Sequence, residues 1–415
     1  MTARRAQWAW SLNGWANHAY ATTVLVAFFP IFFDKYWAKD LPGTVSTGYL
    51  GLANGCAGAV VMVLAPWLGA VADRRGWKKR FLGLFTALGV VASAALALIG
   101  EGQWQLALAV FGLSSIGFFG SFSFFDALLV EVARPEESDR VSAFGYAMGY
   151  LGGGLIFLFD VLLVLHPAWF GLADAVAATR AAFLSVALWW ALFAWPLFRY
   201  VPEAQPTSEA AGWRELWHTM RTIARDPPVR TFLLGYWIYI DALGTLQQMA
   251  VDFGAKLGFS SSALIQALLL VQFISFPAAL GFGWLAGRIG TRRAIYLGLA
   301  GLVAVSGWSY FLHTERQFYA MASLVGLVQG GVQSLSRSYF SRLIPREKSG
   351  EYFGFYNFIG KFAAVIGPLV VGAVAVFSGN QRLSIFPLIV SFALGGWLLS
   401  RVRERTLATQ VGRFA

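Results

Sequence analysis

The chain has 415 residues, of which 57% are hydrophobic and only 13% are charged, and its net charge is +11. Soluble domains carry roughly 25% charged residues, so this composition excludes an ordinary soluble protein. Cys56 is the single cysteine. One thiol excludes an internal disulfide and any cysteine-based zinc or redox motif.

Long apolar runs follow one another along the chain, separated by short charged segments. A run of about 20 apolar residues can span a bilayer, and continuous runs exclude the alternating pattern of a membrane β-barrel. We therefore predict an all-α integral membrane protein with twelve transmembrane helices. The predicted spans are residues 7–33, 46–72, 79–100, 104–132, 138–165, 174–201, 229–255, 260–287, 293–312, 316–343, 350–378 and 381–402.

Two segments of the chain repeat each other about half a chain apart. The stretch from Gly69 to Lys79 is similar to the stretch from Gly283 to Arg293, and Phe144-Gly145-Tyr146 is similar to Phe353-Gly354-Phe355. Self-similarity at half the chain length predicts two pseudo-symmetric six-helix halves, the architecture of alternating-access transporters. We expect an N-terminal six-helix bundle at 1–201, a cytoplasmic linker at 202–228 and a C-terminal six-helix bundle at 229–415.

The linker has its own pattern. Trp213, Leu216, Trp217 and Met220 recur at helical spacing, with arginines on the other faces. This pattern predicts an amphipathic helix on the cytoplasmic surface of the membrane.

The basic residues are unevenly placed. In the twelve-span arrangement, 24 of the 32 Lys and Arg lie on one side of the membrane and six on the other, while Arg337 and Lys361 lie inside spans. The positive-inside rule then places both termini in the cytoplasm, and we expect a bacterial inner (plasma) membrane. The excess predicts attraction to anionic membrane lipids, not binding to nucleic acid.

The sequence also lacks several motifs that cofactors, metals and enzymatic activities require. The sequence has no GxxxxGK[ST] loop for a nucleotide, no metal-ligand cluster and no nucleophile–base grouping. We therefore expect no cofactor, no bound metal and no enzymatic activity. The expected partners are a small-molecule substrate, protons and membrane lipids, and we expect a monomer.

The stretch from Gly69 to Lys79 resembles the signature loop between the second and third helices of the major facilitator superfamily, G-x-x-x-D-R-x-G followed by basic residues. A carboxylate at Asp73 can pair with an arginine, for which Arg134 is the expected partner, or cap a neighbouring helix N-terminus. The second copy has Gly287 in place of the acid, so we expect a weaker latch there. The expected gating residues are Gly69, Asp73, Arg74, Gly76, Glu131, Arg134, Gly283 and Arg288.

A narrower resemblance is carried by three segments: Trp15 to Thr23, Gln329 to Ser338, and Phe353 to Ala364. They are similar to the vacuole-effluxer-like branch of that superfamily, with a weaker match at Tyr239-Ile240-Asp241. The resemblance implies twelve helices, an exporter-like role and amino acids as cargo. The sequence departs from the branch at Gly14, where an acidic residue is usual.

Ionisable and polar residues inside the spans are functional candidates because they are costly there. Residues four apart share a helix face, and such stripes would suit a small polar solute in a central cavity. The expected substrate-binding residues are Asn13, Asn17, His18, Tyr20, Tyr146, Tyr150, Gln329, Gln333, Arg337, Asn357 and Lys361, and the expected proton-coupling residues are Asp241 and Asp126.

Two readings of these charges stay open. Arg337 and Lys361 can bind a substrate carboxylate, or they can pair with Asp126 and Asp241. The leading hypothesis is a secondary active transporter of small, amino-acid-like solutes that exports them with proton coupling by alternating access. The alternatives are a flippase of lipids or lysolipids or an exporter of hydrophobic compounds, and a membrane sensor or scaffold that transports nothing.

Overall fold

The computed structural model describes residues 3–203, 206, 213–379 and 382–402, and these residues form helices and connections without a β-strand. The first half contains α1 (Ala3–Ala19), η1 (Tyr20–Phe28), α2 (Phe29–Phe32), η2 (Phe33–Trp37), α3 (Gly43–Arg75), α4 (Lys78–Leu96), α5 (Trp104–Ala127), α6 (Leu129–Val132), α7 (Ser138–Leu165), η3 (Pro167–Phe170) and α8 (Ala175–Tyr200). After α9 (Trp213–Arg225), the second half contains α10 (Pro227–Lys256), α11 (Ser261–Ile289), α12 (Thr291–Ser309), α13 (Glu315–Leu343), η4 (Arg346–Lys348), α14 (Ser349–Ser378), η5 (Leu383–Ile385) and α15 (Phe386–Ser400).

These helices correspond to the predicted spans. Among the described residues, eight segments are long and apolar enough to cross a membrane by length and composition alone. The other four predicted spans correspond to α10, α12, α13 and α14. Of these, α13 carries a polar stripe that lowers the mean hydropathy of the helix, and α14 includes side chains that lie outside the described residues.

The first span is irregular in a way that the sequence did not indicate. It runs from Ala3 to Trp37 as one continuous segment, but η1 and η2 are π-helical. A π-helix changes the direction in which later side chains point, and such segments often mark functional positions. The face that α1 presents is therefore not continued by the residues that follow it.

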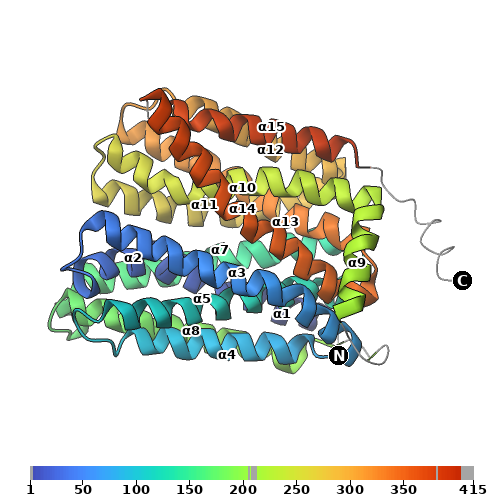
Figure 1. Ribbon diagram of the computed structural model, residues 1–415, viewed down its shortest axis with the longest axis horizontal. Coiled ribbons are helices and arrows are strands. Elements are labelled where there is room, and N and C mark those ends of the chain that lie inside the picture. Colours follow the sequence, from blue (N-terminus) through green and yellow to red (C-terminus); the bar gives the residue numbers. More distant parts are fainter. Residues whose placement is uncertain (1–2, 204–205, 207–212, 380–381, 403–415) are drawn as a thin grey trace, which may run out of the picture.

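The two halves lie one above the other in Figure 1, with the first half in blue to green and the second in yellow to red. Each half has its own hydrophobic core, around Phe111 and Trp190 in the first and around Phe232 and Phe340 in the second. The halves meet where α3 packs on α14 and where α7 packs on α11. These two contacts are related by the sequence repeat, and the predicted fold class is confirmed.

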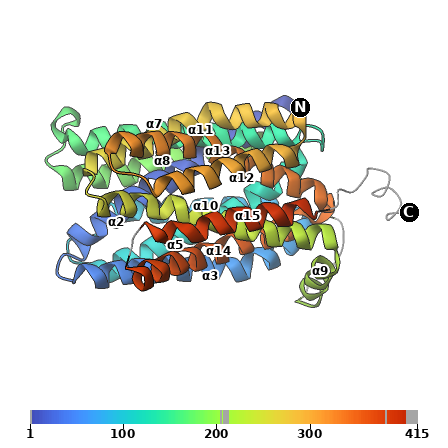
Figure 2. The same ribbon diagram turned by 90° about the horizontal axis from the view of Figure 1, so that it is seen from above.

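One end of the molecule carries the N-terminus and α9, which runs across the ends of both halves (Figure 1). We call this the α9 end. Figure 2 shows that α9 projects beyond the helices of the two halves. Trp217 and Met220 are exposed on it, as expected of an amphipathic helix at a membrane surface. The side chains of Trp213 and Leu216 lie outside the described part of the chain, and the domain boundaries at 201 and 229 stay a prediction.

Candidate functional site

A buried ion pair joins the two halves. Nη1 of Arg337, on α13, donates to Oδ1 of Asp126, on α5, at 2.8 Å. Each residue is about 1% exposed. Of the two readings that the sequence left open for Arg337, the structure shows the pairing with Asp126.

The pair is held by further donors and acceptors from both halves. Arg337 donates through Nε to Oγ of Ser142 at 2.9 Å and through Nη2 to the Ser142 carbonyl at 3.0 Å. Asn357, on α14, donates to Oδ2 of Asp126 at 3.2 Å. A buried ion pair is tolerated only when its remaining polar atoms are also hydrogen-bonded, and this arrangement meets that requirement.

Aromatic rings enclose the guanidinium. Its carbon lies 4.4 Å from the ring centre of Tyr146, 4.8 Å from that of Trp10 and 5.3 Å from that of Phe125. Trp10 is itself fixed because its indole nitrogen donates to the Phe125 carbonyl at 2.9 Å. Three rings within this range stabilise the cation and exclude water from the pair.

A second polar layer lies beside the ion pair. The hydroxyl of Tyr150 donates to Oε1 of Gln333 at 2.6 Å, again across the two halves. The ring of His18 lies 6.0 Å from that of Tyr146 and 5.6 Å from that of Tyr150, and its Nδ1 lies 3.0 Å from the Gly14 carbonyl. His18 and both tyrosines therefore lie in the same region as Arg337.

Gln329 lies in the same stripe of α13, and its hydrogen bonds among the described residues are to the second half. Its Oε1 accepts from Gln247 at 2.8 Å, and its Nε2 donates to Ser275 at 3.0 Å. The stripe is thus a single helix face that contains two kinds of contact. Among the described hydrogen bonds, those of Gln333 and Arg337 reach the first half, and those of Gln329 do not.

The stripe in α1 is placed differently. The hydroxyl of Tyr20 bonds to Ser114 at 2.7 Å and to Ser115 at 3.0 Å, both on α5, so Tyr20 lies inside the first half. Asn13 and Asn17 are fully buried, and their amide atoms have no hydrogen-bond partner among the described residues. These three residues do not contact Arg337 or the second half through any described bond.

Asp241 also lies away from the ion pair. Its Oδ1 accepts from the Gly367 amide at 3.0 Å, and it lines a cavity between α10, α14 and α15, all in the second half. Lys361 belongs to α14, but its side chain lies outside the described residues. Asp126 and Asp241, which the sequence grouped together, therefore occupy different surroundings.

At the α9 end, Asp73 forms a first latch between the halves. Its two carboxylate oxygens accept from the amides of Gly350 at 2.9 Å and Glu351 at 2.8 Å, at the start of α14. The positive end of the helix dipole favours a carboxylate there. The close approach depends on Gly69, because a Cβ at that position would lie 2.5 Å from the Gly350 carbonyl carbon.

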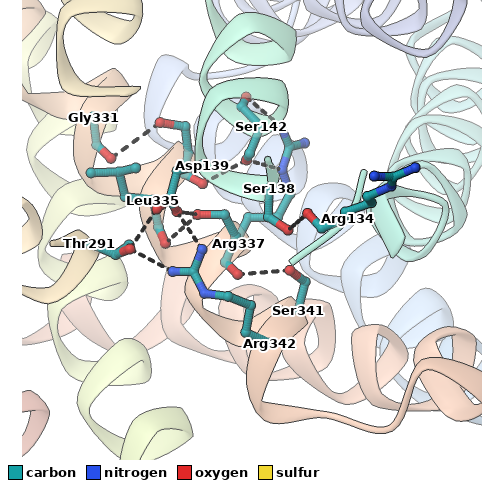
Figure 3. Close-up of polar contacts among 12 residues, drawn as sticks. Arg134, Ser138, Asp139, Ser142, Thr291, Gly331, Leu335, Arg337, Ser341 and Arg342 are labelled. Carbon is teal, nitrogen blue, oxygen red and sulfur yellow. Dashed lines mark hydrogen bonds and ion pairs between the residues drawn. The ribbon is translucent and has the colours of Figure 1, made fainter. Parts of the chain in front are cut away.

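The salt-bridge partner expected for Asp73 requires correction. Asp73 pairs with Lys78 at 3.1 Å, and Lys78 also bonds to Glu131 at 3.0 Å and to Ser349 of the other half at 2.8 Å. Arg134 is exposed, and in Figure 3 its side chain points away from the network drawn. Because it sits at the surface end of the α6–α7 connection, it does not reach the buried carboxylate.

A second latch joins α7 to the other half (Figure 3). Oδ1 of Asp139 accepts from Ser338 at 2.5 Å and from Arg342 at 3.0 Å, and Oδ2 accepts from Thr291 at 2.6 Å. Arg342 also donates to Thr291 at 2.6 Å. The acid that is missing at Gly287 is thus supplied from the opposite half by Asp139.

The remaining predicted gating residues have varied positions. Gly283 lets α11 approach α7, since a Cβ there would lie 2.6 Å from that of Ala143. Gly76 ends α3 with a positive φ of 63°, and Arg74 is half-buried. Arg288 is exposed and lies over the ring of Trp284 at 4.3 Å, so it is not part of the second latch.

Sequence reasoning missed Lys78, Asp139, Ser142 and Arg342. Lys78 and Asp139 stand in the first turns of their helices, where charged residues usually face water. Lys78 lies inside the repeated segment from Gly69 to Lys79, among the basic residues that end the motif, and Asp139 lies shortly after the predicted gating residue Arg134.

The chain matches, over residues 2–410, the family model described as "Vacuole effluxer Atg22 like". The chain belongs to this family. A relative from Bacillus subtilis (strain 168), described as "Uncharacterized MFS-type transporter YxiO", is 36% identical over 405 residues, covering 96% of this chain and 95% of the relative. Autophagy-related protein 22 of Yarrowia lipolytica is 26% identical over 62% of this chain and 49% of that protein. The chain therefore spans about half the length of that fungal relative.

Solved structures agree on the fold. The human organic anion transporter MFSD10 (TETRAN) matches with a TM-score of 0.76 at 18% identity, covering 96% of this chain and 100% of that chain. The proton:xylose symporter XylE matches with a TM-score of 0.72 at 13% identity, covering 97% and 96%. This member of the Atg22-like effluxer family is thus an integral membrane transporter of the major facilitator type, not an enzyme.

Proposed function

We propose that this Atg22-like protein is a secondary active transporter that exports small, amino-acid-like solutes by alternating access, coupled to protons. The observation that carries the proposal is the buried pair of Arg337 and Asp126, contributed by opposite halves at 2.8 Å. A charge pair across a moving interface must be exchanged for another partner each time the halves separate. A substrate is the natural replacement.

The chemistry of the pair favours a zwitterion. Arg337 can bind a carboxylate through two parallel hydrogen bonds, and Asp126 can accept from an ammonium group. An α-amino acid carries both groups. Its carboxylate can replace Asp126 as the partner of Arg337, and its ammonium group can replace Arg337 as the partner of Asp126. Tyr146, Tyr150 and Gln333 lie around the pair and would contact the rest of the solute.

Alternating access assigns roles to the two latches. The α9 end carries the basic excess, so we place it in the cytoplasm, with both termini on that side of a bacterial inner membrane. Asp73 and Asp139 then hold the cytoplasmic end shut, and both must release their partners before the site opens inward.

For proton coupling, Asp126 is the better candidate of the two predicted acids. It lies between the halves, whereas Asp241 lies within one of them. A proton on Asp126 would remove the negative charge that holds Arg337 and free the guanidinium for a substrate carboxylate. Proton binding and substrate binding would then occur at the same ion pair.

The sensor alternative rests on two absent acids. The absence of an acid at Gly14 has a packing reason, because a Cβ there would lie 2.6 Å from the Gly145 carbonyl oxygen. The absence at Gly287 is offset by Asp139. These absences therefore give little support to a sensor that transports nothing.

A ligand screen tests the proposal. Purified protein would be heated with amino acids, dipeptides, organic acids and lysolipids, since a ligand of the folded state raises its apparent stability. We expect stabilisation by zwitterionic amino acids, at least tenfold weaker in Arg337→Lys, which keeps the charge but loses the bidentate geometry. Stabilisation by lysolipids alone would overturn the proposal.

A further inference from the structure

A cavity of about 220 Å³ lies inside the second half, between α10, α14 and α15. We propose that it binds a small organic cation, namely a primary ammonium that carries a short apolar group. This site is separate from the one between the halves, and it goes beyond the proposed transport function.

Asp241 provides the charge. It is the one acidic residue among the side chains that line the cavity, and its neighbours there are mainly aliphatic. The described contact of its carboxylate is the Gly367 amide at 3.0 Å, and no salt bridge to it is present in the described part of the chain. A carboxylate in apolar surroundings is costly unless a cation or several donors compensate it. A bound ammonium would supply that compensation.

Gly367 leaves room for the carboxylate of Asp241. A Cβ at Gly367 would lie 2.8 Å from Oδ1 of Asp241. The absence of a side chain there lets the carboxylate lie at the wall of the cavity, which Gly367 also lines. Thr245, whose hydroxyl such a Cβ would overlap, is fully buried and is not among the residues that line the cavity.

The carboxylate selects the kind of cation. A primary ammonium has three donors, so it can bond to the carboxylate oxygens of Asp241. A quaternary ammonium has none and could pair only through its charge. Trp237 also lines the cavity, and an indole ring can bind a cation through its face.

The size and position of the cavity limit the rest of the ligand. Its volume is below the roughly 300 Å³ at which sites for drug-sized molecules begin, so the apolar group must be short. Val371 and Leu388 line it, and Val370, which also lines it, is 41% exposed on the outside of the bundle. The cavity therefore reaches the side of the protein that faces lipid, and a cation with an apolar tail can enter from the membrane.

Binding there needs no separation of the halves. The lining residues belong to α10, α14 and α15, whereas Arg337 contacts the opposite half. The two sites can therefore be tested separately in the same full-length protein.

The test uses n-butylammonium as the probe, with 1-pentanol as a neutral analogue of the same length and tetramethylammonium as a cation without donors. Thermal unfolding of the purified protein is followed over a concentration series of each. We expect a saturable rise in stability with n-butylammonium and none with the other two. An equal rise with 1-pentanol would overturn the proposal, because it would reflect apolar binding alone.

Variants locate the site. Asp241→Asn should abolish the effect of n-butylammonium, because the charged hydrogen-bond acceptor is lost. Ala242→Leu, which fills part of the cavity, should weaken binding. Thr245→Val changes a buried side chain that lies beside the cavity and does not line it, so it is the matched control and should bind normally.

Two outcomes separate this proposal from the transport function. Binding of n-butylammonium that persists in Arg337→Lys, while binding of amino acids is lost, supports two sites. Binding of n-butylammonium that is normal in Asp241→Asn and Ala242→Leu overturns this inference and leaves the proposed transport function intact.

Discussion

Replacing Gly69 by alanine should open the α9 end of the transporter. A Cβ at Gly69 would lie 2.5 Å from the Gly350 carbonyl carbon and closer still to its oxygen, whereas ordinary contacts begin at 3.4 Å. The difference means that α3 and α14 must separate by at least about 0.9 Å at this point. Both partners are backbone atoms of packed helices, so no flexible side chain can absorb the change.

That separation is enough to break the first latch. The amides of Gly350 and Glu351 lie 2.9 and 2.8 Å from the carboxylate of Asp73, and a contact stretched to about 3.6 Å is no longer a hydrogen bond. A hydrogen bond to a charged group contributes about 1.5–3 kcal/mol. Losing even one should raise the open population about tenfold or more.

Cysteine labelling measures this opening. Cys56, which is exposed, is first replaced by serine, and a cysteine is then introduced as Ala127→Cys. Ala127 is fully buried at the α9 end, and its carbonyl accepts from Ser349 of the other half at 3.2 Å. A membrane-impermeant maleimide added from the α9 side should label this cysteine about tenfold faster when Gly69→Ala is present.

The matched control is Gly58→Ala on the same helix, where an added Cβ meets no atom within 4 Å. It should leave the labelling rate unchanged. If Gly69→Ala and Gly58→Ala label at the same rate, the close approach of α3 and α14 does not hold the α9 end shut, and the reasoning is refuted.

Three further predictions follow from the same contacts. Arg337→Gln and Asp126→Asn should each lower the free energy of unfolding by about 3–5 kcal/mol, because each leaves a buried charge unpaired. The double variant leaves no buried charge unpaired, so it should recover most of the loss. Additive losses in detergent-unfolding titrations would contradict this. Asp139→Asn should speed labelling at Ala127→Cys in the way that Asp73→Asn does, and an unchanged rate would show that the second latch is not needed for closure. Gly14→Asp, which restores the acid usual in the family, should lower the unfolding temperature because its Cβ meets the Gly145 carbonyl oxygen at 2.6 Å; a normal unfolding temperature would refute the packing explanation.

Hydropathy and the internal repeat predicted the large features of this protein. The apolar runs gave the spans, because each must be long enough to cross a bilayer. The repeat predicted paired halves, and it relates the contact of Gly69 with Gly350 to that of Gly283 with Ala143. The place of Asp73 at the end of a span left open whether it pairs with an arginine or caps a neighbouring helix, and the structure shows the capping.

The partners of the charged residues could not be predicted in the same way. Helical spacing says which residues share a face, but not which helix the face meets. Asn13, Asn17 and Tyr20 share a face, yet Tyr20 bonds to Ser114 inside its own half. Asp139 had no distinguishing pattern, because its role depends on α13 of the other half lying beside it.

Counterflow in proteoliposomes tests the central claim most directly. Vesicles that contain the purified protein are loaded with the amino acid that stabilises it best, and entry of the labelled amino acid is followed with and without an imposed proton gradient. We expect saturable counterflow that responds to the gradient, is lost in Arg337→Gln and persists in Cys56→Ser. Counterflow that is equal in wild type and Arg337→Gln, or absent from wild type under both conditions, would contradict it.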